Sequence, residues 1–235
     1  MHYTVAGEGE PVVLVHGLSA SSLWWTRNVR SLAEHYRVYM VDLPGFGTMR
    51  RAHRRFALIE AADWLLAWME AVGIERAHLV GHSMGGYICI QLAVQRPDSV
   101  RRLVLIAPAG LPGGRTIRGY LVPLLLAIWY TTPTFLVILF YDALRTGPLM
   151  LLRAAQDLLS KDMREDLKAI KAPTLIIWGV NDTLVSPQLG RVLRQEIANA
   201  RLLVLPGAGH IVMFDRAREV NRALLEFLAG KAVAE

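Results

Sequence analysis

Short apolar runs alternate along the chain with longer stretches in which apolar residues recur every three or four positions. The short runs are typical of parallel strands buried on both faces, and they occupy residues 11–16, 37–42, 77–80, 100–107, 174–178 and 202–205. The longer stretches predict helices at residues 59–72, 87–94, 186–197 and 216–228. This alternation predicts an α/β fold, with a mostly parallel central sheet flanked by helices and joined by right-handed crossovers.

The alternation is interrupted between residues 109 and 162, where the chain is rich in leucine, isoleucine and aromatic residues. The sequence therefore predicts a core domain formed by residues 1–108 and 163–235, with a hydrophobic helical cap or lid at 109–162. Residues 119–141 of this cap form a run of 23 positions without a charge, which meets the length criterion for a membrane-spanning helix. A spanning helix is disfavoured, because prolines interrupt the run and the helix would have to leave and re-enter one continuous domain.

Two other interpretations of the uncharged run stay open. The favoured one is a lid whose aromatic side chains line an acyl pocket, with candidate substrate-binding residues Trp129, Phe135 and Phe140. In the other, the same side chains bring the lid into peripheral contact with a lipid surface. The basic residues Arg50, Arg51, His53, Arg54 and Arg55 would then meet anionic head groups, although most such segments are simply solvated loops.

A strained turn is predicted where the apolar run at 77–80 meets the helical pattern that follows it. The turn reads Gly81-His82-Ser83-Met84-Gly85, which is the G-x-S-x-G pattern of a nucleophile elbow. In such an elbow the serine hydroxyl is pushed clear of the backbone, and glycines are needed where a Cβ would collide with the adjoining strand and helix. We therefore expect Ser83 to be a catalytic nucleophile.

A serine hydroxyl is a weak nucleophile, so Ser83 needs a base and the base needs an orienting carboxylate. The chain has one histidine after Ser83, which is His210 in a glycine-rich loop behind the last predicted strand. The carboxylate is expected to be Asp182, which follows a core strand, with Asp157, Asp162 and Asp215 as weaker candidates. Ser186 is predicted to cap the next helix, which would leave Asp182 free for the triad.

Backbone donors for a developing oxyanion are expected on both sides of the elbow. Met84 begins the helix after Ser83, and Leu18 follows the strand that ends at His16-Gly17. Their N–H groups are the two candidate members of an oxyanion hole. His82 is too close in sequence to Ser83 to serve as its base, and His16 is expected to brace its loop.

Composition restricts the classes of partner and the compartment. The net charge of +6 comes mostly from scattered arginines without an aromatic platform, so no nucleic-acid partner is expected. The single cysteine excludes an intramolecular disulfide, and no metal or cofactor is expected for the chemistry. The first residues lack a positive charge followed by an apolar core, so the sequence predicts a cytoplasmic protein. Oligomeric state is not predicted.

Taken together, these segments resemble an α/β-hydrolase-fold protein of the compact serine esterase or lipase type. The segments that carry the resemblance are His16-Gly17, Asp42-Leu43-Pro44-Gly45-Phe46-Gly47, Gly81 to Gly86, Pro173 to Gly179 with Asp182, and Gly209-His210. The resemblance implies a cap inserted after the strand that follows the elbow helix, which is where residues 109–162 fall. One departure is the short N-terminus, which leaves room for at most one strand near residues 2–5, where the family usually has an antiparallel pair.

The resemblance implies a cofactor-free hydrolase of carboxylic esters that works through an acyl-enzyme. Ser83 excludes the epoxide hydrolases and haloalkane dehalogenases, which place aspartate at the elbow. Carbon–carbon bond hydrolases tend to have asparagine before the serine and tryptophan after the histidine, whereas this chain has His82 and Ile211. That class is disfavoured but stays open, together with acyltransferases, thioesterases, lactonases, perhydrolases and a non-catalytic binding protein.

Overall fold

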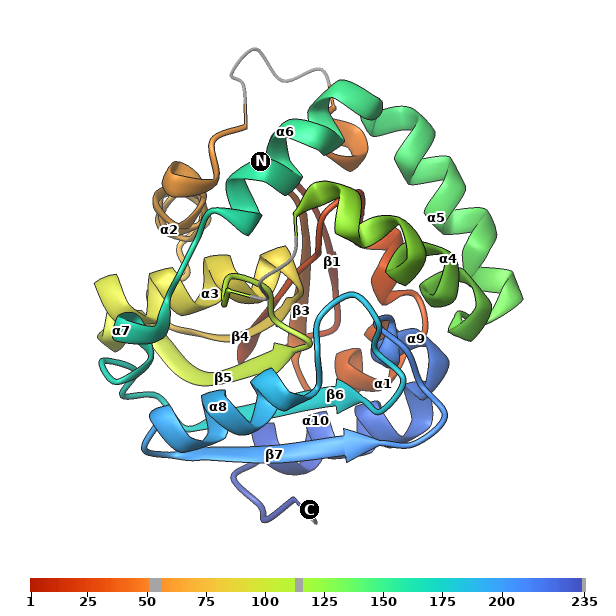
Figure 1. Cartoon of the computed structure of the whole chain (residues 1–235). Coiled ribbons are helices and arrows are strands. Elements are labelled where there is room, and N and C mark those ends of the chain that lie inside the picture. The colour runs from red at the N-terminus through yellow and green to blue at the C-terminus, as the bar shows by residue number, and fades with distance from the viewer. Residues whose placement is uncertain (51–55, 113–115, 234–235) are drawn as a thin grey trace.

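A computed structural model describes residues 1–50, 56–112 and 116–233, and its centre is one twisted sheet (Figure 1). Its strands are β1 (His2–Ala6), β2 (Pro11–Val15), β3 (Arg37–Asp42), β4 (Ala77–His82), β5 (Val100–Ile106), β6 (Thr174–Gly179) and β7 (Ala200–Leu205). They are ordered β1-β3-β2-β4-β5-β6-β7, and every pairing is parallel except that of β1 with β3. The predicted α/β fold is confirmed, and the single N-terminal strand is the antiparallel edge.

Helices cover both faces of this sheet. They are α1 (Val29–Ala33), α2 (Ala61–Ala71), α3 (Met84–Gln95), α7 (Arg164–Leu167), α8 (Gln188–Glu196), α9 (Val212–Asp215) and α10 (Ala217–Leu228). Side chains alternate across each strand, so Val13 and Val15 face one core while Val12 and Leu14 face the other. The first core is completed by α2, α3 and α8, and the second by α1, α9 and α10.

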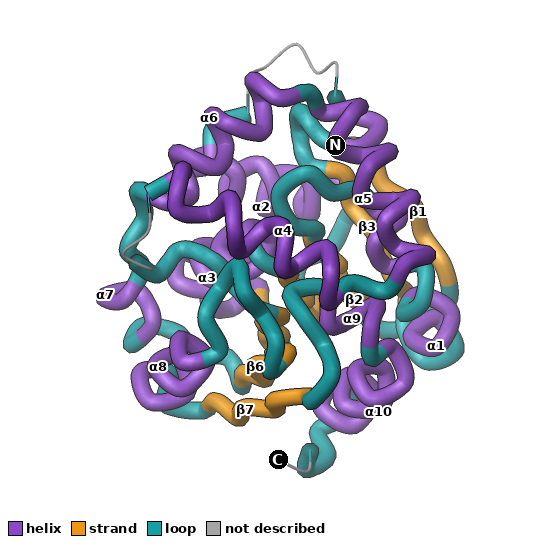
Figure 2. The backbone as a smooth tube through the Cα atoms, turned by 45° about the vertical axis from the view of Figure 1, so that its right-hand side comes forward, coloured by secondary structure: helices purple, strands orange, loops and turns teal. Residues whose placement is uncertain are grey.

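The segment between β5 and α7 forms three further helices, α4 (Leu121–Tyr130), α5 (Pro133–Thr146) and α6 (Pro148–Leu159). The chain turns at Thr131-Thr132 before Pro133, and again at Gly147, whose φ of +81° suits glycine, before Pro148. Pro123 causes no break, because it lies in the first turn of α4 where its missing N–H costs no helical hydrogen bond. The three helices arch over the rest of the molecule (Figure 2).

The length and polarity of the helices bear on the membrane question raised by the uncharged run. Among the described residues, no single helix is both long enough and apolar enough to cross a bilayer. The pair α5 and α6 reaches that length and hydropathy together, but the two helices are bent by 97°. The predicted basic segment is described as far as Arg50, and residues 51–55 lie outside the described ranges.

Candidate active site

Ser83 occupies a sharp turn between β4 and α3. Its φ of +51° is in the region that L-residues rarely adopt, and its C=O accepts hydrogen bonds from the N–H groups of Gly86 and Tyr87. A Cβ on Gly81 would lie 2.5 Å from the oxygen of Gly85, and one on Gly85 would lie 2.2 Å from the oxygen of Val15. The strand, the turn and the helix are therefore packed backbone against backbone, which holds Ser83 in its strained conformation.

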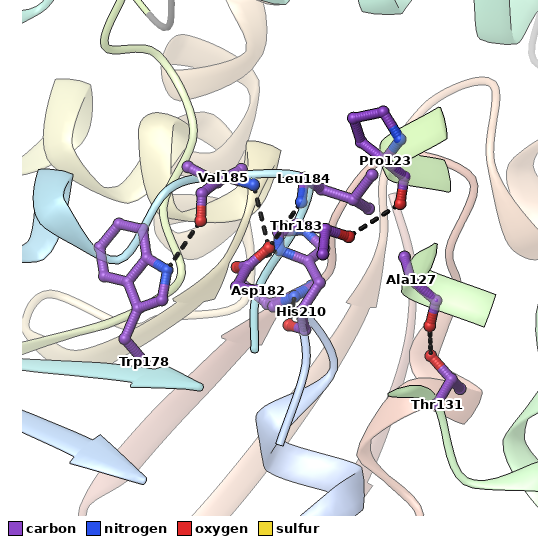
Figure 3. A network of polar contacts seen from close by, with 10 residues as sticks. Pro123, Ala127, Thr131, Trp178, Asp182, Thr183, Leu184, Val185 and His210 are labelled. Atoms are coloured by element: carbon purple, nitrogen blue, oxygen red, sulfur yellow. Dashed lines mark hydrogen bonds and ion pairs between the residues drawn. The ribbon is translucent and has the colours of Figure 1, made fainter. Parts of the chain in front are cut away.

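His210 and Asp182 form a buried, hydrogen-bonded pair (Figure 3). His210 Nδ1 lies 2.8 Å from Asp182 Oδ2, so its N–H donates to that carboxylate oxygen and Nε2 is left to act as a base. The residues come from the loops after β6 and β7, at the carboxyl ends of neighbouring parallel strands. The structure thus joins two residues that are 28 positions apart in the sequence.

The second oxygen of Asp182 has a separate role. Oδ1 accepts hydrogen bonds from the N–H groups of Leu184 and Val185, each 2.9 Å long. The prediction that Ser186 caps α8 is wrong: Pro187 occupies the cap position, and the Ser186 hydroxyl bonds the Gln188 side chain instead. Ser186 therefore does not take over the capping role from Asp182. Oδ2 of Asp182 accepts from His210, and Oδ1 holds the backbone that leads into α8.

The weaker carboxylate candidates have other partners or lie in the open. Asp162 is exposed and pairs with Arg164, while Asp157 is exposed on α6. Asp215 Oδ1 accepts hydrogen bonds from the N–H and the hydroxyl of Thr132, at 3.0 and 2.7 Å. Asp182 is accordingly the carboxylate that the structure pairs with His210.

His82 has a positioning role that the sequence did not predict. Its Nε2–H donates to the backbone oxygen of His210 at 3.0 Å, and the two rings lie 4.9 Å apart. Burial, followed by the nearby His210 ring, holds the pKa of His82 well below its ordinary value, so the ring is neutral. Because His82 directly precedes Ser83, this bond holds the loop of His210 against the elbow. A short strand ending in histidine carries no signal of such a contact.

The loop after β2 lies against the other side of Ser83. A Cβ on Gly17 would lie 2.9 Å from His82 Nδ1 and 3.1 Å from the Ser83 Cβ, so a larger residue at this position would force these neighbours to shift. His16 braces the loop: its Nδ1–H donates to the oxygen of Gly17 at 2.8 Å, and its Nε2 accepts the N–H of Leu43 at 3.1 Å. Burial lowers the pKa of His16, which keeps the ring in this neutral form.

The positions of Leu18 and Met84 are consistent with the predicted oxyanion hole. Leu18 follows Gly17 at the point of closest approach to Ser83, and Met84 opens α3 directly after it. Backbone N–H groups at the start of a helix lack partners within the helix and favour a developing negative charge. Leu18 and Met84 therefore remain the candidate donors.

The three predicted triad residues are almost completely buried, and α4 of the predicted cap lies beside two of them. Ser83, Asp182 and His210 are 7%, 6% and 7% exposed. The Thr183 hydroxyl donates to the backbone oxygen of Pro123 in α4 at 2.8 Å, next to Asp182 (Figure 3). A Cβ on Gly209 would lie 3.2 Å from the Cβ of Tyr130, so the end of α4 sits against the loop of His210. Charges that form in such a site interact more strongly than they would in water.

The three predicted substrate-binding side chains are not brought together. Phe135 is fully buried in the second core, with its ring centroid 4.9 Å from Trp24 and 4.7 Å from Phe214. Trp129 and Phe140 instead point outward, and Trp129 is 83% exposed. In this structure none of the three lines an acyl pocket over Ser83. Within the described ranges, no group of three His, Cys, Asp or Glu side chains is placed to hold a metal ion.

Comparison with known proteins places this geometry in a family. Residues 12–223 match the Alpha/beta hydrolase family. The 2-hydroxy-6-oxo-6-phenylhexa-2,4-dienoate hydrolase of Comamonas testosteroni is 32% identical, over 97% of this chain and 91% of that protein. The acetyltransferase component of the acetoin cleaving system of Pseudomonas putida is also 32% identical, over 96% of this chain, which spans 65% of that protein's length.

A solved structure agrees with these relatives. The enol-lactonase of Burkholderia xenovorans LB400 superposes with a TM-score of 0.83 and 26% identity, covering 97% of this chain and 96% of that one. The family match over residues 12–223 includes the segment 109–162 that is predicted to be a cap. The family match over most of the chain and the relatives at 32% identity show that the chain belongs to the alpha/beta hydrolase family.

Proposed function

We propose that this protein is a serine hydrolase that cleaves carboxylic esters with a fairly apolar acyl part. The observation that carries the proposal is the buried Asp182–His210 pair, held beside the strained Ser83 turn by His82. An imidazole oriented by a carboxylate, close to a serine on a strained turn, is the arrangement used for acyl transfer through a covalent intermediate.

In the proposed reaction Ser83 Oγ attacks the ester carbonyl carbon while His210 Nε2 removes the hydroxyl proton. Asp182 stabilises the imidazolium that forms, and the N–H groups of Leu18 and Met84 hold the oxyanion. The tetrahedral intermediate collapses, and the proton on His210 passes to the leaving alkoxide, which departs as the alcohol. Water, deprotonated by the same His210, then attacks the acyl-enzyme and releases the acid and free Ser83.

Two features support an ester as the substrate. An ester needs no cofactor and no charged recognition group, and the cap that covers the triad is predominantly apolar. The enol-lactonase among the similar structures takes its name from a lactone, which is a cyclic ester. The reaction would release the free acid, as its acyl-enzyme is hydrolysed.

A second candidate is hydrolysis of a carbon–carbon bond beside a ketone. It is favoured by the dienoate hydrolase relative, which is 32% identical over 97% of this chain. Against it, His82 stands before the nucleophile and Ile211 after His210, where that class tends to have asparagine and tryptophan. Both reactions begin with the same triad and a carbonyl group, so substrate turnover must separate them.

The test compares wild type with Ser83→Ala on p-nitrophenyl esters of increasing acyl length and on a 2-hydroxy-6-oxo-dienoate. We expect ester turnover to fall by about 10⁶-fold in kcat when the nucleophile is removed. Ser160→Ala, at the exposed end of α6, is the matched control and should be unchanged.

Three outcomes would decide against the ester proposal. Equal ester rates in wild type and Ser83→Ala would end it outright. Serine-dependent turnover of the dienoate, faster than of any ester, would favour the second candidate. A folded protein that a fluorophosphonate does not label at Ser83 would indicate a binding protein without catalysis.

A further inference from the structure

The outward side of the cap carries many exposed apolar side chains, which we call the outer cap face. It is formed by residues of α4 and α5, namely Leu121, Val122, Leu125, Trp129, Val137, Phe140, Tyr141 and Leu144. Val137 is 73% exposed and Leu144 is 83% exposed. Large apolar patches on a protein surface usually mark a binding surface, because exposing them to water is unfavourable.

These side chains are not exposed because α5 has one apolar face that points to solvent. Helix α5 is apolar on both sides. On α5, Phe135, Ile138, Leu139 and Asp142 point inward, at the spacing i, i+3, i+4 and i+7. Val137, Phe140, Tyr141 and Leu144 repeat the same spacing on the outward side. A helix that is apolar on both sides is expected to be covered on both sides, and only the inward side is covered in this chain.

Buried polar contacts fix which side of the cap faces inward. Asp142 Oδ2 accepts the hydroxyl of Ser21 at 2.8 Å and the indole N–H of Trp24 at 3.0 Å. At the start of α5, Thr132 donates twice to Asp215. Turning the outer cap face inward would break these contacts and leave a carboxylate unpaired, so rotation of α5 is an unfavourable way to hide it.

The charges of the cap indicate what could cover this face. In residues 116–146, the segment that contains α4 and α5 and therefore the outer cap face, the charged residues are Arg118, Asp142 and Arg145. Asp142 is buried, so the charges left at the surface of this segment are cationic. The Arg145 guanidinium lies 4.8 Å from the Tyr141 ring, at the border of the outer cap face. A second copy of the chain would set these cations against the same cations, whereas an anionic lipid surface complements them.

We propose that the outer cap face docks the protein on membranes that contain anionic phospholipids. The apolar side chains would enter the region between head groups and acyl chains while the arginines contact phosphates. Trp129 would lie near the interface, where amphipathic aromatic rings are favoured. The proposal concerns attachment to one leaflet and does not depend on the reaction at Ser83.

The test measures binding of the full-length Ser83→Ala protein to vesicles by flotation. One vesicle preparation contains phosphatidylglycerol and phosphatidylcholine in equal amounts, and the other contains phosphatidylcholine alone. We expect clear binding to the anionic vesicles, weaker binding to the neutral ones, and a decrease with salt. Trp129 is the most exposed of the six tryptophans, so its emission should shift to the blue on binding, and Trp129→Phe should abolish the shift.

Two pairs of variants separate the apolar and the electrostatic contributions. Val137→Ser with Leu144→Ser should abolish flotation, whereas Val5→Ser with Val204→Ser, at exposed apolar positions on edge strands β1 and β7, should not. Arg118→Gln with Arg145→Gln should weaken partitioning by about 25-fold. Arg201→Gln with Arg222→Gln, which removes two exposed arginines elsewhere, should have little effect.

Other results would overturn the proposal. These are no flotation with either vesicle, or equal flotation of the wild-type and Val137→Ser/Leu144→Ser proteins. A dimer in light scattering that the same two substitutions dissociate, without vesicle binding, would show that a second copy covers the face. Because Ser83→Ala is used throughout, the outcome is independent of whether the protein hydrolyses esters.

Discussion

The elbow and the cap are both built from apolar residues, but they place them differently. Around the elbow every large side chain is buried, and backbone atoms approach so closely that no Cβ fits at Gly81 or Gly85. In the cap, Phe135 is buried while Phe140, five positions later on the same helix, is exposed. The high apolar content of the chain, 53%, therefore does not reflect a larger core alone. At the elbow, apolar residues fix the position of the backbone. On the cap, some of the apolar residues stay exposed to solvent.

The largest effect is expected from a change at Asp182, the carboxylate of the buried pair near the elbow. We expect Asp182→Asn to lower kcat by about 10⁴-fold, because an amide cannot hold the imidazole in the tautomer that leaves Nε2 free. The measurement is ester turnover, with circular dichroism to establish that the fold is retained.

Asp215→Asn is the matched control for this substitution. Asp215 Oδ1 accepts hydrogen bonds from Thr132 at the start of α5 and not from His210, so the loss of its charge should change kcat less than tenfold. If both variants lost activity equally, cap anchoring rather than orientation of His210 would explain the role of Asp182.

A second prediction uses the two phenylalanines of α5. Phe135→Ala should lower the free energy of unfolding by about 3–5 kcal/mol, because the ring is fully buried between Trp24 and Phe214. Phe140→Ala should change it by less than about 0.5 kcal/mol, because half of its surface already contacts water. Urea unfolding of the two variants measures the difference. Similar losses in both would mean that the outer cap face is packed in solution.

Much of the core could be predicted because its signals are local. Continuous apolar runs mark strands buried on both faces, and the G-x-S-x-G pattern needs no distant contact to be recognised. The sequence has one histidine after Ser83, so His210 can be identified as the candidate base by elimination. The sequence therefore predicted both the fold and the residues that meet as the Asp182–His210 pair.

The parts that could not be predicted depend on contacts between distant segments. His82 bonds a backbone oxygen 128 positions away, and nothing in its neighbours indicates this. Asp182 binds backbone N–H groups with one oxygen and His210 with the other. The sequence instead predicts that Ser186 caps the helix, with Asp182 bound to the histidine alone. In α5 both faces are apolar, so periodicity identifies a helix without indicating which face is covered. The sequence therefore predicts the same role for Phe135 and Phe140, although the structure places them on opposite sides of the helix.

The smallest expected effect concerns the link between the cap and the core at Asp142. Burial, reinforced by the negative charge of Asp42, raises the pKa of Asp142, although hydrogen bonds from Ser21 and Trp24 and the charge of Arg145 oppose this. The folded protein therefore binds this proton more tightly than the unfolded chain does. The resulting stability is fully present below the ordinary aspartate pKa of about 4, and it is lost as the pH rises through the raised value.

Asparagine can accept the same two hydrogen bonds but does not titrate. The free energy of unfolding of Asp142→Asn, minus that of wild type, should therefore increase as the pH rises from about 4 and then level off. Urea unfolding at a series of pH values measures it, with Asp157→Asn on the exposed side of α6 expected to run parallel to wild type. A difference that is flat with pH would mean that Asp142 is not desolvated in solution, and hence that the cap does not rest on the core at this contact. The inner side of the cap would then be as open to water as its outer face, and the contrast between the two would be lost.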